Sequence, residues 1–128
     1  MRVNLPASIG ELFDKITILE IKRSKIKDKI KLKIINQELK LLKKVVLTKK
    51  IKTRNLTSLI KQLKNINIRL WNVEDKLRIF EKNQSFKKDF ISYARKVYHM
   101  NDKRAYLKNE INKKTNSLIS EVKSYEKY

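Results

Sequence analysis

Only one glycine and one proline occur among 128 residues, and this scarcity constrains the fold more than any other feature of the chain. Both residues are common in the turns of β-rich folds, in which tight turns follow one another closely. Apolar residues recur instead at spacings of three and four, which is the period of a helix face. We therefore predict an all-α fold, a bundle of four to five helices in a single domain over residues 1–128.

The first half of the chain contains clear signals for where helices begin. After an extended lead-in over residues 1–7, Ser8 and Glu11 have the spacing of a capping box, which starts the first helix. Asp28 is placed to cap a second helix. The basic segment 48–55 is predicted to be an exposed loop.

The second half of the chain predicts a long antiparallel helical hairpin. Its first helix starts within residues 55–58 and ends near Asn83. Its second helix begins at Phe86 after a cap at Ser85. The last segment, 116–128, is predicted to be a short terminal helix or a tail.

Charged and polar side chains interrupt the apolar stripes of these helices. At about 100° per residue, Glu20 and Arg23 fall beside the apolar residues of the first helix. Glu74, Arg78 and Glu81 fall on the apolar side of the third helix. Burying an isolated charge is costly, so such side chains are usually paired, hydrated or functional. The residues predicted to line a cleft between helices are Glu20, Arg23, Trp71, Glu74, Arg78, Glu81, Tyr98, Asn101, Arg104 and Lys108, with Asn67 and Asn112 turned to the same side.

This polar cluster has two interpretations. It is either an ion-pair network that fixes the register of the helices, or a cleft for a small anionic ligand. In the second case Arg78, Arg104 and Lys108 hold a phosphate or carboxylate, and a glutamate accepts a sugar hydroxyl or holds Mg²⁺. Trp71 or Tyr98 then stacks on a ring of the ligand.

The sequence names no reaction. It contains no glycine-rich phosphate loop and no nucleophile elbow. With no cysteine and only His99, we predict no metal site and no cofactor. Helical enzymes that hydrolyse nucleoside triphosphates use paired E-x-x-E and E-x-x-D runs, whereas here Glu11 with Asp14 stands alone. A non-enzymatic binding or assembly protein is favoured over an enzyme acting on a phosphorylated or sugar-nucleotide substrate.

The net charge of +20 raises the question of a nucleic-acid or anionic-membrane partner. Lysines far outnumber arginines and are spread along the chain, which favours compositional drift with a soluble basic surface over nucleic-acid binding. No apolar run approaches the ~20 residues that a membrane span needs. The start of the chain also lacks the pattern of a secretory signal, so we predict a cytoplasmic protein.

Several residues indicate self-association, with a dimer preferred. Ile18 and Ile21 lie on the mostly polar side of the first helix, and a helix that is apolar on two sides is central in its bundle or buried in an oligomer. Arg95 and Asp102 lie on the outer face of the fourth helix, where they could pair with another helix or another subunit.

Four blocks of the sequence resemble a bacterial family of small uncharacterised proteins. They are GELFDKITILEIK (10–22), LWNVEDKLRIFE (70–81), FISYARKVYHMNDKRAYLKNEIN (90–112) and SEVKSYEKY (120–128). The resemblance implies a small, all-helical cytoplasmic protein whose gene lies near sugar-transferase or surface-polysaccharide genes, and it implies no established activity. The residues that fit the family's polar pattern are Glu11, Lys15, Glu20, Lys22, Trp71, Glu74, Asp75, Arg78, Arg95, Tyr98, Asn101, Asp102, Arg104 and Lys108.

Overall fold

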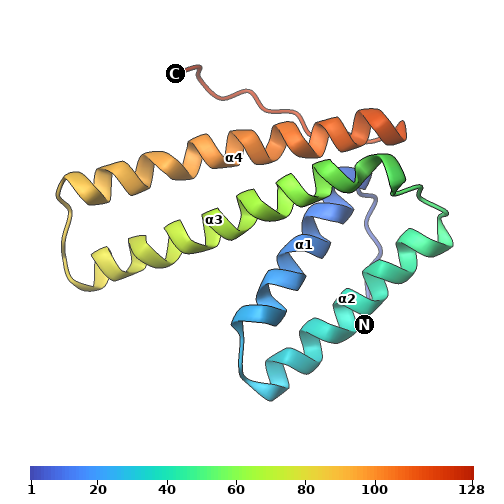
Figure 1. Ribbon diagram of the computed structural model, residues 1–128, viewed down its shortest axis with the longest axis horizontal. Helices are drawn as coiled ribbons and strands as arrows, with labels where there is room; N and C mark the ends of the chain where they lie inside the picture. Colours follow the sequence, from blue (N-terminus) through green and yellow to red (C-terminus); the bar gives the residue numbers. More distant parts are fainter.

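The computed structural model describes residues 1–128 and contains helices but no strands (Figure 1). The α-helices are α1 (Ile9–Lys25), α2 (Lys29–Thr48), α3 (Thr57–Lys82) and α4 (Lys88–Thr115). A short 3₁₀ helix, η1 (Arg54–Leu56), precedes α3. The predicted all-α bundle is thus confirmed, with four packed α-helices.

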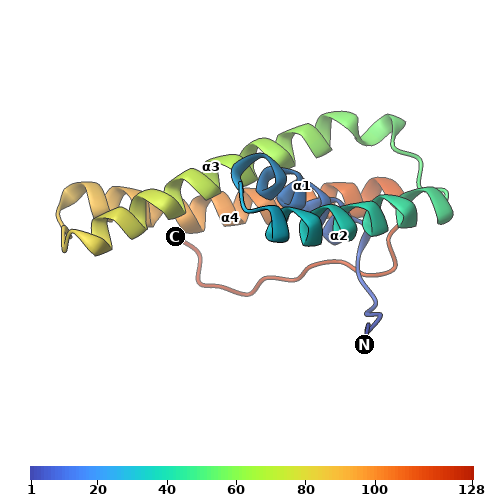
Figure 2. The same cartoon turned by 90° about the horizontal axis from the view of Figure 1, so that it is seen from below.

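The two longest helices, α3 and α4, lie side by side and antiparallel, as predicted for the hairpin (Figure 1). Helix α1 crosses them obliquely and contacts all three other α-helices. Helix α2 packs against α1 alone and forms one edge of the molecule (Figures 1 and 2). This arrangement makes α1 the centre of the bundle.

The apolar stripes read from the sequence form the core. Leu63, Ile66, Leu70 and Val73 of α3 are buried, as their spacing predicts. They pack in one cluster with residues of the other helices, namely Phe13, Ile16, Leu19, Ile35, Leu39, Leu56, Met100, Leu107 and Ile111. The core therefore follows the 3.6-residue period of the sequence.

A second face of α1 is also buried. Gly10, Asp14, Thr17 and Ile21, spaced by four, three and four residues, are all buried. Ile21 is only 3% exposed within the chain itself, so it is not available for the predicted contact with another subunit. The central position of α1 explains why this helix is apolar on two sides, and self-association stays a prediction.

Two of the three predicted helix caps are confirmed. The Ser8 hydroxyl accepts a hydrogen bond from Glu11 N at 3.0 Å, and Asp28 accepts one from Lys31 N at 3.0 Å. The Ser85 cap is wrong, because α4 starts at Lys88 and its N-cap residue, Lys87, makes no side-chain hydrogen bond. The turn after α3 is closed by backbone bonds instead, including Ser85 N to Phe80 O.

The caps allow a direct test by single substitutions. We expect Ser8→Ala to lower the free energy of unfolding by about 1 kcal/mol, because one amide at the start of α1 loses its acceptor. Ser85→Ala should change this free energy by less than about 0.5 kcal/mol. Urea denaturation of both variants measures the difference. Equal effects of the two substitutions would contradict this assignment of the caps.

Helix α4 runs without a break from Lys88 to Thr115, through Asn101 and Asp102. It ends at Asn116, which adopts the left-handed conformation common at helix ends. Residues 117–128, here called the C-terminal tail, form no helix and run back along the side of α4 that faces away from α3 (Figures 1 and 2). No helix combines the length and the apolar composition needed to cross a membrane.

Candidate functional site

A buried carboxylate joins three helices at the centre of the bundle. Asp14 of α1 is 1% exposed and accepts hydrogen bonds from Arg104 Nε at 2.9 Å and Nη2 at 2.6 Å. Asn67 of α3 donates to Asp14 Oδ1 and to Thr17 Oγ1, both at 2.9 Å. The two-point contact fixes the plane of the guanidinium group, because arginine and carboxylate forks match in geometry. Asp14 therefore fixes one edge of the Arg104 guanidinium group.

A second buried charge lies one turn further along α4. The side chain of Lys108 is 8% exposed, and its Nζ lies 2.6 Å from Glu11 Oε2 and 2.8 Å from Glu121 Oε2. Glu121 Oε2 is itself buried, and no donor is aligned with it for a hydrogen bond despite this short ion pair. Lys108 thus links α1 and α4 to the C-terminal tail.

The beginning of α1 docks tightly on the end of α4. Gly10 N donates to Asn112 Oδ1 at 2.6 Å, and Ile9 N donates to Ser117 Oγ at 3.2 Å. A Cβ atom on Gly10 would lie 2.3 Å from the carbonyl oxygen of Lys108. Only glycine permits this approach of the two backbones.

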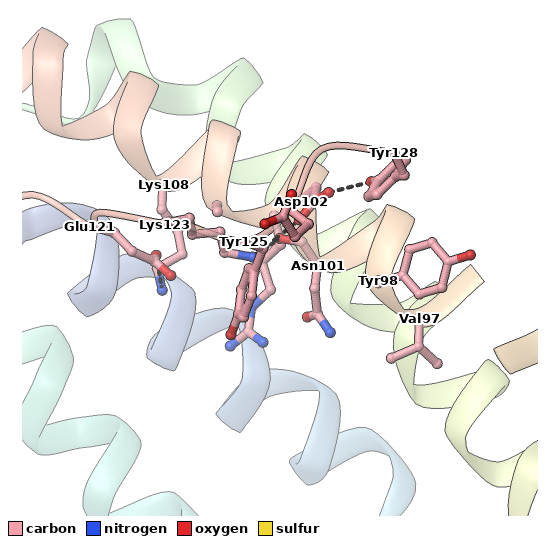
Figure 3. A pocket seen from close by; sticks show the side chains of 12 residues that line it. Val97, Tyr98, Asn101, Asp102, Lys108, Glu121, Lys123, Tyr125 and Tyr128 are labelled. Carbon is pink, nitrogen blue, oxygen red and sulfur yellow. Dashed lines mark hydrogen bonds and ion pairs between the residues drawn. The ribbon is translucent and has the colours of Figure 1, made fainter. Parts of the chain in front are cut away.

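The tail is attached to α4 at two further points. The side-chain amide of Asn109 donates to the carbonyl of Glu121 at 3.1 Å and accepts from its N–H at 3.2 Å. Near the end of the chain, the Tyr128 hydroxyl donates to Asp102, and Lys123 Nζ lies 3.4 Å from the same carboxylate. Figure 3 shows Tyr128 directed toward Asp102. Polar contacts therefore hold the tail along α4.

Between the tail and α4 lies a pocket of about 730 Å³, here called the α4–tail pocket (Figure 3). This volume falls in the range of small-molecule sites, which is roughly 300–1,000 Å³. Its lining combines tyrosine rings with side chains of both charges: Val97, Tyr98, Asn101, Asp102, Arg104, Ala105, Lys108, Glu121, Lys123, Tyr125, Glu126 and Tyr128. No three imidazole or carboxylate groups of the structure are gathered to hold a metal ion.

Four groups around the pocket have pKa values that move away from neutrality. The hydrogen bonds to Asp14 raise the pKa of Arg104. Burial lowers the pKa of Lys108, but its ion pairs with Glu11 and Glu121 outweigh this effect and raise the value. The contact between Tyr128 and Asp102 lowers the pKa of the carboxyl and raises that of the phenol. These groups keep their ordinary charges near pH 7.

Four of the ten residues predicted to line a cleft do line this pocket, namely Tyr98, Asn101, Arg104 and Lys108. The predicted inward positions of Asn67 and Asn112 are confirmed, since both are buried. Asp102, expected to face another helix or subunit, pairs with the chain's own tail. Arg95 is exposed and Ile18 is partly buried.

The other six residues predicted to line a cleft do not line the α4–tail pocket. Arg23 and Glu81 are exposed, and Arg78 pairs with Glu74 at 2.6 Å on the surface, where its side chain is 72% exposed. Glu20 is partly buried and lies 3.8 and 3.9 Å from Lys43 and Lys64. Trp71 is partly buried on α3 and does not line the α4–tail pocket.

Sequence reasoning missed the most deeply buried charge. Asp14 appeared only as half of a lone E-x-x-D run with Glu11, yet these two carboxylates bind Arg104 and Lys108. The available signal was the second face of α1, on which Gly10, Asp14 and Thr17 follow one another at helical spacing. A small residue and two short polar ones on one face are typical of close helix packing rather than of a wetted surface.

The contact between Tyr128 and Asp102 predicts how attachment of the tail depends on pH. Because the pKa of Asp102 is lowered, its contribution is present above about pH 4 and is lost as the pH falls through the lowered value. Because the pKa of Tyr128 is raised, its contribution is present below about pH 10 and is lost as the pH rises through the raised value.

We expect the ring contact between Tyr98 and Tyr128, seen as nuclear Overhauser effects, to stay constant from about pH 5 to pH 9 and to weaken on both sides. A Tyr128→Phe variant, which lacks the hydroxyl, should show a weaker contact across the whole range. Weakening of the wild-type contact within the plateau would contradict the assigned pair.

Comparison with known protein families gives a match that covers the whole chain. Neither the curated proteins nor the solved structures include a match to this sequence. The family that does match is described as a family of unknown function, and the match extends over residues 1–128, including the tail that lines one side of the pocket. The chain therefore belongs to the family of unknown function DUF6165.

Proposed function

We propose that this chain is a non-enzymatic binding protein that holds a small ligand in the α4–tail pocket. The ligand carries one anionic group and several hydroxyl groups, as a sugar phosphate or a sugar acid does. The observation that carries the proposal is the position of Arg104, which is held by Asp14 on one edge and lines the pocket.

The geometry of Arg104 leaves donors free for a ligand. A guanidinium group has five N–H donors, and the bonds to Asp14 use only the Nε and one Nη2 donor. Nη1 makes no hydrogen bond within the chain, and it is not among the buried unsatisfied atoms. A fixed guanidinium edge binds a carboxylate or phosphate without first losing side-chain freedom.

The charges of the lining favour a ligand with a single anionic group. Three cations, Arg104, Lys108 and Lys123, face three carboxylates in the same pocket, Asp102, Glu121 and Glu126. A nucleoside triphosphate would bring several negative charges close to these carboxylates, and like charges repel. Hydroxyl groups, in contrast, donate readily to carboxylate oxygens.

Three tyrosines complete the lining. Tyr98 and Tyr128 pack with their ring centroids 5.2 Å apart, and Tyr125 adds a third ring. Aromatic side chains offer a large apolar face together with a polar tip, which suits the face of a sugar ring. The implied proximity to surface-polysaccharide genes is consistent with such a ligand.

The direction of the pKa shifts supports binding rather than acid–base catalysis. A general acid or base works best with a pKa near the working pH. The pKa values of Asp102, Lys108 and Tyr128 all move away from neutrality. These groups are suited to holding a ligand in fixed charge states.

Titration calorimetry with glucose 1-phosphate and glucuronate tests the proposal, with inorganic phosphate and glucose as partial ligands. We expect Lys123→Ala to weaken binding about tenfold or more, because a charge-assisted hydrogen bond is lost. Tyr98→Ala should weaken binding of the sugar ligands but not of inorganic phosphate. Arg78→Ala is the matched control, since this arginine lies on the surface, and it should bind like wild type. Absence of binding to both sugar ligands, or equal effects of Arg78→Ala and Lys123→Ala, would overturn the proposal.

A further inference from the structure

Helix α2 has very little of its surface buried within the chain. It packs only against α1, and only Ile35 and Leu39 of its 20 residues are buried. The opposite side of this helix carries a second set of apolar residues. Ile30 is 76% exposed and Ile34 is 60% exposed, and Leu41 and Val45 are also exposed.

These four exposed residues form one continuous stripe, here called the α2 outer stripe. At about 100° per residue, Ile30, Ile34, Leu41 and Val45 fall within about 60° of one another. Isolated apolar residues on a surface need no explanation, but an aligned row on one helix face is typical of an interaction site. The outer stripe therefore indicates a partner with an apolar region that can cover it.

A row of lysines runs beside the outer stripe. Lys29, Lys33, Lys40 and Lys44 are exposed, and none of them pairs with a carboxylate of the chain. The first three border a shallow groove with Asn36 and Gln37 that contains no acidic residue. Lys40 and Lys44 border a second groove, also without an acidic residue. The partner must therefore combine an apolar phase with anionic groups beside it.

We propose that α2 docks on an anionic lipid bilayer, with the outer stripe among the acyl chains and the lysine row at the headgroup phosphates. An apolar helix face bordered by lysine is the pattern of helices that lie in a membrane interface. Lysine side chains also reach outward from such a face to the headgroups. The α4–tail pocket lies on other elements, so the two proposed sites share no residue.

Two other occupants fit the surface less well. Residues 25–54 contain twelve basic and two acidic residues, a net charge of +10, so a second copy would bring two strongly basic helices together. A nucleic acid would match the lysines, but its phosphates offer nothing to cover four exposed apolar side chains. A bilayer satisfies both features at once.

Vesicle co-sedimentation at about 0.15 M salt tests the proposal with the full chain. We expect binding to phosphatidylcholine vesicles that contain about 30% phosphatidylserine, and at least tenfold weaker binding to pure phosphatidylcholine. Ile30→Gln with Ile34→Gln should weaken binding about tenfold or more, because the apolar contact is lost while helix propensity is kept. Lys29→Gln, Lys33→Gln and Lys40→Gln together should weaken it about 100-fold.

Matched controls exist on the hairpin. The controls are Ile79→Gln with Ile91→Gln, and Lys82→Gln with Lys87→Gln and Lys88→Gln. They change exposed residues away from α2 and should alter vesicle binding less than twofold. Circular dichroism confirms that each variant is folded. The proposal is overturned if wild type does not bind the anionic vesicles, or if the Ile30→Gln, Ile34→Gln variant binds them as wild type does. Wild type that binds duplex DNA but not vesicles would assign the lysine row to nucleic acid instead.

Discussion

The Arg104→Ala variant should lose about 3–5 kcal/mol of the free energy of unfolding, the largest effect we expect from a single substitution. It leaves the Asp14 carboxylate, which is 1% exposed, with Asn67 as its only side-chain donor. Taking an ionised carboxylate out of water without a counter-charge is costly, so the loss reflects that stranded charge more than the worth of the pair. Urea denaturation followed by circular dichroism measures it.

A surface pair of the same chemistry provides the control. Arg78 and Glu74 also approach to 2.6 Å, but both side chains are exposed. Arg78→Ala should therefore change the free energy of unfolding by only about 0.5 kcal/mol or less. Equal losses for Arg104→Ala and Arg78→Ala would show that the Asp14 pair is not buried in solution.

A double substitution separates the cost of the stranded Asp14 charge from the stability that the ion pair itself contributes. When both partners are replaced by apolar residues, as in Asp14→Leu with Arg104→Met, no charge is left buried. We expect this variant to recover most of the stability lost by Arg104→Ala, although Asn67 then lacks its carboxylate acceptor. A double variant less stable than Arg104→Ala would mean that the ion pair itself contributes the stability.

The helices and the core of this bundle were predictable because they depend on local spacing. The stripe from Leu63 to Val73 repeats every three or four residues, so a helical period places it on one face whatever the partner is. The same arithmetic turned Asn67, Arg104 and Lys108 inward. These side chains lie where α1, α3 and α4 meet, and there a helix is covered around much of its circumference.

The helical wheel placed Glu74, Arg78 and Glu81 on the apolar side of α3, but at these residues α3 is covered on one side only. The far halves of α3 and α4 extend beyond α1, and there α3 has only α4 as a neighbouring helix (Figure 1). Only a narrow stripe is buried there, so Glu74, Arg78 and Glu81 at its border stay in contact with water. A helical wheel gives the direction of a side chain, whereas burial depends on how far the neighbouring helices extend.

The half of the candidate site that the C-terminal tail contributes could not be predicted from helical periodicity. The tail brings Glu121, Lys123 and Tyr128 to α4 as an extended segment, and the side chains of such a segment follow no helical pattern. The tail is attached to Asn109 and Asp102 of α4, and no regular sequence spacing relates these residues to their partners in the tail. The resemblance of SEVKSYEKY to a family block was the only sign in the sequence that this segment belongs with the site.

The Gly10→Ala variant should be less stable than wild type by roughly 1–3 kcal/mol or more, although helix propensity alone predicts a gain of about 1 kcal/mol. The new Cβ atom would lie 2.3 Å from Lys108 O and 2.9 Å from Asn112 Oδ1, so α1 must move away from α4. That movement lengthens the 2.6 Å bond from Gly10 N and pulls Glu11 away from Lys108. Thermal unfolding followed by circular dichroism measures the net sign.

A second substitution tests whether the backbone contact is the cause. Asn112→Ala removes the side-chain oxygen near the new Cβ atom but leaves the carbonyl of Lys108 in place. The Gly10→Ala, Asn112→Ala variant should therefore stay at least as unstable as Gly10→Ala alone, since a backbone carbonyl inside α4 is held in place by the helix. A higher melting temperature for Gly10→Ala than for wild type would show that α1 and α4 are further apart than this packing requires. In that case, the close approach of α1 and α4 would not be what positions Glu11 beside Lys108.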